Sequence, residues 1–92
     1  MKVIVTLQDL KGQNHTENDF CAEMPELPQV GDLIVHNKCE VNEEAYKQWY
    51  PDLQEYGASE AFRVEFRGWA VFHDEAKAVI NPFIVVRNIG NN

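Results

Sequence analysis

The chain has 92 residues, 45% hydrophobic and 25% charged, which predicts a single folded domain over residues 1–92 with one modest core and no need for a cofactor. The formal net charge of −7 disfavours direct nucleic-acid binding, because phosphate neutralisation supplies most of that affinity. No stretch approaches the roughly 18 apolar residues of a membrane span, and the N-terminus lacks the apolar run of a secretion signal. Two cysteines are too few for a disulfide scaffold, so we expect a cytoplasmic protein with free thiols.

The first third of the chain predicts three short strands, over residues 2–8, 19–24 and 33–35. The first is rich in β-branched residues and points Val3, Val5 and Leu7 inward. Between the second and third strands, Pro25 and Pro28 prevent regular pairing and predict a loop.

A helix is predicted at about residues 42–50. Asn42 suits the N-cap, and the acids after it face the positive end of the helix dipole. Tyr46 and Trp49 begin an aromatic stripe that we expect to pack on the sheet, and Pro51 limits the helix to about two turns.

The last third predicts a long hairpin, with strands at 61–73 and 77–87. Its first strand is predicted to alternate apolar and polar side chains without interruption from Phe62 to His73, and Asp74 begins the turn. Gly68 and Pro82 stand at matching heights, where each permits a bulge or a sharp bend.

These elements predict a mainly-β, α+β fold: a strongly bent antiparallel sheet or small open barrel of about five strands, with one helix before the C-terminal hairpin. An open sheet and a closed barrel are both compatible with the pattern. The residues predicted to form the core are Val3, Val5, Leu7, Leu33, Phe62, Val64, Phe66, Phe72, Ile80, Ile84 and Val86.

The candidate binding surface is the polar side of the first hairpin strand. Strict alternation places Arg63, Arg67, Trp69 and His73 in one outward row, beside Val71. Ion pairs along the strand can account for the charged members. An outward tryptophan needs another explanation, because large apolar groups on a wet face usually have a cover: the helix, another protomer or a ligand.

Our leading hypothesis is a non-enzymatic protein-interaction module that self-associates or binds a partner through Trp69, Arg67, Arg63 and His73. A second hypothesis is an acidic mimic or inhibitor of a nucleic-acid-binding protein, because a dense anionic surface attracts whatever binds phosphate. The third is a small-ligand or metal-binding protein.

A metal site has weak support. His36 and Cys39 have the spacing of half a zinc site, which Cys21, His15 and His73 could complete, but a second closely spaced ligand pair is absent. No P-loop, dinucleotide fingerprint, nucleophile elbow or H-E-x-x-H motif occurs, and a core this small leaves little room for an enclosed pocket. We therefore predict no catalytic residues, no metal ligands and no cofactor.

Three segments carry a resemblance: LPQVGDLIV at 27–35, FRVEFRGW at 62–69 and FIVVR at 83–87. They are similar to segments of small uncharacterised bacterial proteins carried on phages and integron gene cassettes, many of which look like strongly bent β-barrels. The resemblance implies a mobile genetic element as the setting and a compact β fold. It brings no catalytic or binding residues.

Overall fold

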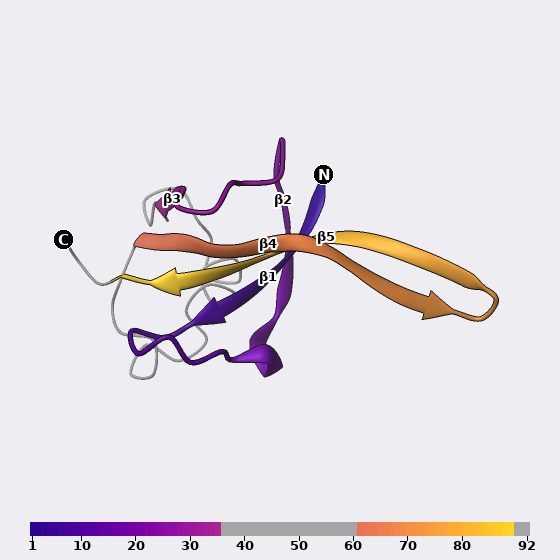
Figure 1. Cartoon of the computed structure of the whole chain (residues 1–92), viewed down its shortest axis with the longest axis horizontal. Helices are drawn as coiled ribbons and strands as arrows, with labels where there is room; N and C mark the ends of the chain where they lie inside the picture. Colours follow the sequence, from indigo (N-terminus) through magenta and orange to yellow (C-terminus); the bar gives the residue numbers. More distant parts are fainter. Residues whose placement is uncertain (36–60, 90–92) are drawn as a thin grey trace.

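The computed structural model describes residues 1–35 and 61–89, which form one strongly curled five-stranded sheet (Figure 1). The strands are β1 (Lys2–Gln8), β2 (Phe20–Glu23), β3 (Leu33–Val35), β4 (Ala61–Asp74) and β5 (Lys77–Asn88), with the 3₁₀ helix η1 (Thr16–Asn18) between β1 and β2. Their spatial order is β2-β1-β5-β4-β3. Because β2 and β3 lie at opposite ends of this order, the described sheet is open.

The mainly-β, strongly bent fold class is confirmed, and every predicted strand is present with nearly its predicted bounds. The helix predicted at about 42–50, with its aromatic stripe, lies outside the described residues.

One pair of strands departs from the antiparallel arrangement that the sequence predicts. β1 and β5 run parallel, with Ile4 opposite Phe83 and Gln8 opposite Arg87. Parallel neighbours need a long connection, and here the chain passes through β2, β3 and β4 before it returns beside β1. The sheet is therefore mixed.

The core lies on one face of the sheet, which we call the inner face. Seven side chains there have no exposed surface: Val3, Val5, Leu7, Phe62, Val64, Ile84 and Val86. Phe20, Ala22, Met24, Leu27 and Ile34 pack against this cluster. All seven belong to the predicted core, since each lies in a part of its strand where the predicted alternation holds.

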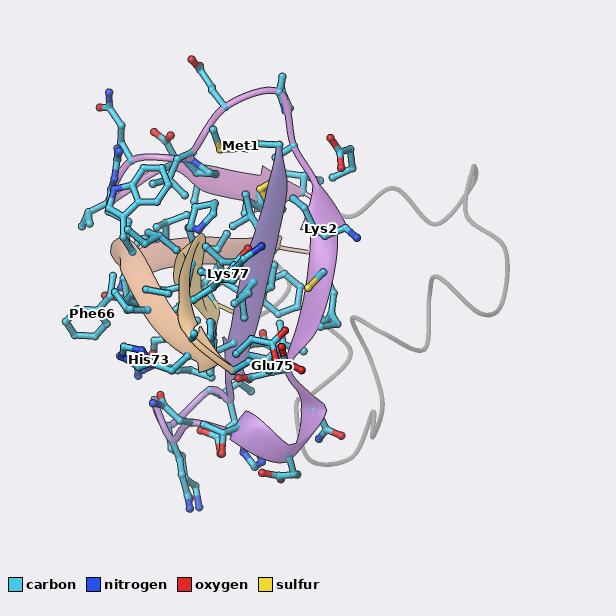
Figure 2. The ribbon with its side chains drawn as sticks, turned by 90° about the vertical axis from the view of Figure 1, so that its right-hand side faces the viewer. Met1, Lys2, Phe66, His73, Glu75 and Lys77 are labelled. Carbon is cyan, nitrogen blue, oxygen red and sulfur yellow. The ribbon has the colours of Figure 1, made fainter. Side chains whose placement is uncertain are left out.

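A β-bulge interrupts the alternation of β4. Val64 lies opposite Val86, whereas Phe66 lies opposite Val85, so Glu65 is an extra residue without a counterpart on β5. Since side chains change face at every residue, one extra residue moves all later side chains to the other face. Phe66 consequently lies on the outer face, where it is 60% exposed and points away from the strands (Figure 2).

The prediction that Phe66, Phe72, Leu33 and Ile80 belong to the core is wrong, because all four are at least half exposed. The bulge puts Phe66 and Phe72 on the outer face, and Leu33 shares that face because it lies opposite Arg63. Ile80 is on the inner face, but it lies beyond the part of β5 that pairs with β1.

Gly68 stays in regular register, opposite Phe83, so the predicted irregularity falls three residues earlier, at Glu65. A Cβ atom at Gly68 would stand 2.9 Å from Cε1 of Phe83. The Phe83 ring therefore covers the glycine and occupies the space of the missing side chain.

The β4–β5 hairpin extends well beyond the other strands (Figure 1). β5 is paired with β1 only from Phe83 onward, and β4 with β3 only up to Arg63. Residues 66–82 thus form a two-stranded ribbon, which we call the arm, and the described chain measures 45 × 26 × 25 Å.

The bulge makes a prediction about stability. Phe62→Ala should lower the free energy of unfolding by about 3–5 kcal/mol, because it empties a fully buried site. Phe66→Ala should cost less than about 1 kcal/mol, because the ring is already in solvent. Urea denaturation of both variants measures the contrast, and equal losses would contradict the assigned faces.

Candidate functional site

The arm exposes an unusual amount of apolar side chain. Every residue from Val71 to Ile80 is exposed. The large apolar side chains among the exposed residues of the arm are Phe66, Trp69, Val71, Phe72, Val79 and Ile80, with exposed fractions of 43–60%. Contiguous apolar surface of this kind is uncommon on soluble monomers and marks interaction sites.

Both faces of the arm are apolar. On the inner face the opposed pairs are Trp69 with Pro82, Val71 with Ile80 and His73 with Ala78. On the outer face they are Gly68 with Phe83, Ala70 with Asn81 and Phe72 with Val79. A sheet that only covers its own core needs one apolar face. The second apolar face therefore calls for a cover from outside the sheet.

The structure brings together three of the four residues predicted to bind a partner. Arg67, Trp69 and His73 share the inner side of β4 and lie along the arm. Arg63 precedes the bulge, so it lies on the outer face, where its Nη2 atom is 2.8 Å from Oε1 of Glu65. The prediction of a single outward row of four residues is wrong, because Arg63 keeps the predicted outer side while the bulge moves the other three to the inner side.

The arginines of the described chain have different roles. Arg63 pairs with Glu65, and Arg87 donates from Nη2 to the Leu10 carbonyl at 2.9 Å, which ties β5 to the loop after β1. Arg67 makes no ion pair with the described residues 1–35 and 61–89 and lies next to the exposed Trp69. It is the arginine best placed to meet a partner.

The apolar arm residues were not predicted as a surface, because Phe72 and Ile80 were expected in the core. The available indication was strand length. β4 has 14 residues and β5 has 12, whereas β1 has 7 and the remaining strands are shorter still. Short strands cannot cover the whole of a long hairpin, so part of it had to extend past the core.

A buried acid–histidine cluster closes the loop after β1. His15 is 6% exposed, and its Nε2 atom lies 3.0 Å from Oδ2 of Asp9. Its Nδ1 atom lies 3.4 Å from Oε1 of Glu17. The other Asp9 oxygen accepts backbone N–H bonds from Lys11 at 2.9 Å and Gln13 at 3.0 Å. These contacts organise the loop. They also lower the pKa of Asp9, chiefly through the hydrogen bond from His15 and further through the two backbone hydrogen bonds, while burial acts to raise it.

The predicted metal ligands do not converge in the described part of the chain. His15 is engaged by Asp9 and Glu17, Cys21 is exposed on β2, and His73 lies near the tip of the arm (Figure 2). Within residues 1–35 and 61–89, no group of three histidine, cysteine or acidic side chains is arranged to hold a metal ion. His36 and Cys39 lie outside the described residues.

A shallow, mainly apolar pocket of about 390 Å³ lies between the 25–32 loop and β3. Met24, Leu33 and Ile34 contribute apolar walls, and Asp32 contributes a carboxylate. That carboxylate accepts a hydrogen bond from the Gln29 backbone at 2.9 Å, so it already serves the turn into β3.

Comparison with known proteins adds no assignment: no family model matches the chain, and the searches of curated proteins and of solved structures give no match. The resemblance to phage and integron-cassette proteins and the acidic-mimic hypothesis therefore stay predictions. Among the described residues, no helix has the length and apolar character needed to cross a membrane.

The Asp9 cluster predicts how stability depends on pH. The pKa of Asp9 is lower in the folded chain than in the unfolded chain, where it is about 3.9. The stability that the Asp9 carboxylate gives to the folded chain is therefore fully present well above the unfolded-state pKa and is lost as the pH falls through the folded-state pKa. Asp9→Asn should cost about 2 kcal/mol at pH 7, because it removes charged hydrogen bonds, and progressively less below about pH 4.

Denaturation from pH 7 to pH 2 measures this difference. Asp19→Asn, at an exposed carboxylate in the same loop, is the control and should change little. A cost for Asp9→Asn that stayed constant with pH would contradict the role assigned to the carboxylate.

Proposed function

We propose that this protein is a non-enzymatic protein-interaction module whose binding element is the arm. The observation that carries the proposal is the exposure of large apolar side chains on both faces of a hairpin that extends beyond its own sheet. The core formed by the described residues lies at the base of the hairpin and contains none of these exposed side chains. Cover by another protein would remove the exposed surface from water.

The energetic argument favours Trp69 as the centre of the contact. Complete burial of a large apolar side chain contributes roughly 1.5–3 kcal/mol, and Trp69, Val71 and Ile80 are each more than half exposed. Tryptophan and arginine are the residues most often found at the energetic centre of protein interfaces. Arg67 lies on the same face two residues away, and His73 lies on that face nearer the tip.

The test is a double substitution on the arm, Trp69→Ser with Ile80→Ser. We expect it to abolish every protein association of the chain, because it removes the two largest inner-face contacts while the core stays intact. The matched control is Leu10→Ser with Val30→Ser, two apolar side chains that are 49% and 60% exposed away from the arm.

Sedimentation velocity measures self-association, and affinity capture with quantitative mass spectrometry measures association with other proteins. Circular dichroism checks the fold of each variant. If the arm variant kept every association of the wild type, or if the control variant lost the same ones, the arm would not be the binding element.

A further inference from the structure

The register of the hairpin shows which backbone groups of the arm point away from it. Asp74 and Lys77 flank a two-residue turn, so they form a hydrogen-bonded pair. Hydrogen-bonded and non-hydrogen-bonded pairs alternate along an antiparallel ladder. Counting from the turn, four residues of β4 direct their N–H and C=O groups away from β5: Arg67, Trp69, Val71 and His73.

The same edge of β4 is already used on the other side of the bulge. The Val64 N–H donates to the Asp32 carbonyl at 2.9 Å, and the Val64 carbonyl accepts from the Gly31 N–H at 2.8 Å. Beyond Glu65, no described residue continues this pairing. Within residues 1–35 and 61–89, the edge is thus paired up to the bulge and unpaired from Phe66 to the turn.

The two edges of the arm differ. On β5 the outward-directed positions are Ala78, Ile80 and Pro82, and Pro82 has no N–H to offer. Proline and lysine are common devices by which proteins protect an exposed strand edge. The free edge of β4 has neither between Phe66 and Asp74. An incoming strand would therefore add to β4 rather than to β5.

We propose that this strand is β4 of a second copy, added antiparallel about a twofold axis at Ala70. The inference rests on the proposed function, because it names the partner of the same arm. Ala70 is the midpoint of the free segment 66–74, so an axis there pairs the whole segment with its counterpart. An axis at Ala70 also lets the two strands form backbone hydrogen bonds, because each residue with outward-directed N–H and C=O groups then lies opposite another such residue.

This register makes the two arms complementary. Trp69 lies opposite Val71 of the second copy on one face, and Gly68 lies opposite Phe72 on the other. Arg67 lies opposite His73 of the second copy. Aromatic and β-branched pairs of this kind stabilise adjacent strands.

Charge favours contact through the arm. Residues 66–82 contain two cationic and two acidic side chains, Arg67, Lys77, Asp74 and Glu75, and so have no net charge, whereas the chain carries −7. Two copies repel each other through the rest of their surfaces. The neutral arm is the part that two copies can bring together with the least repulsion.

The area sets the strength of the contact. Pairing along the β4 edge would bury backbone and only part of the exposed large apolar side chains of the arm, which amount to roughly 500 Å² per copy, so the contact lies well below the 800 Å² or so of a standard interface. We therefore expect a reversible dimer with a dissociation constant on the order of micromolar.

The first test compares two proline substitutions, one on each edge of the arm. Val71→Pro removes an outward N–H from the β4 edge, and Ala78→Pro removes one from the β5 edge, while both leave the ladder between β4 and β5 intact. By sedimentation equilibrium, Val71→Pro should weaken the dimer on the order of 100-fold, because symmetry applies the substitution twice. Ala78→Pro should change it less than about threefold.

The second test traps the register in a Cys21→Ser, Cys39→Ser chain. Ala70→Cys should form a disulfide-linked dimer at least about tenfold faster than Val71→Cys, because the axis brings the two Ala70 Cα atoms to about 4.5 Å. Faster linkage at Val71 would overturn the axis at Ala70. Equal weakening of the dimer by the two prolines would overturn edge pairing.

These outcomes separate the inference from the proposed function. The wild type could form a dimer that the Trp69→Ser, Ile80→Ser variant dissociates, while the proline variants have no effect and Ala70→Cys forms no disulfide. That result would overturn edge pairing but support the arm as the binding element. A monomeric wild type overturns the second copy as partner. If that monomer also shows no arm-dependent capture of another protein, the proposed function fails as well.

Discussion

The pairing of β4 with β5 is the constraint on which the rest of the structure depends. It joins β1 and β2 on one side of the sheet to β3 on the other, and it supplies four of the seven fully buried core residues. Within this pairing, the single extra residue Glu65 determines which side chains share a face. Up to Val64, the even-numbered side chains of β4 point into the core. From Phe66 onward, the even-numbered side chains lie on the outer face.

Strand length and the bulge have separate effects. Length determines how much is exposed, because β1 and β3 cover only the base of the hairpin. The bulge determines how the exposed side chains are grouped, because it places Arg67, Trp69 and His73 on one side and Phe66 and Phe72 on the other. Without the bulge, the arm would still extend, but its tryptophan would share a face with Arg63.

Much of the fold could be predicted from the sequence, because alternation and β-branched residues are local properties that fix where strands lie. The bulge could not, since Glu65 fits the uninterrupted alternation as well as it fits an insertion. Nor could the parallel pairing of β1 and β5, which depends on the path of the whole chain. The site was therefore only partly predictable: Trp69 was found as an exposed residue, but Arg67, Trp69 and His73 were assigned to the face of Arg63 and lie on the other one.

Gly68 and Pro82 stand at the base of the arm, where the hairpin leaves the other strands. Phe83 covers Gly68 from β5, and the hairpin keeps its register there. Pro82 is buried, lacks an N–H and stands one residue before β5 gains β1 as a neighbour. One edge of the arm is thus blocked at its base while the other keeps its donors. A two-stranded ribbon is marginally stable alone, so a third strand added at the β4 edge would stabilise the arm.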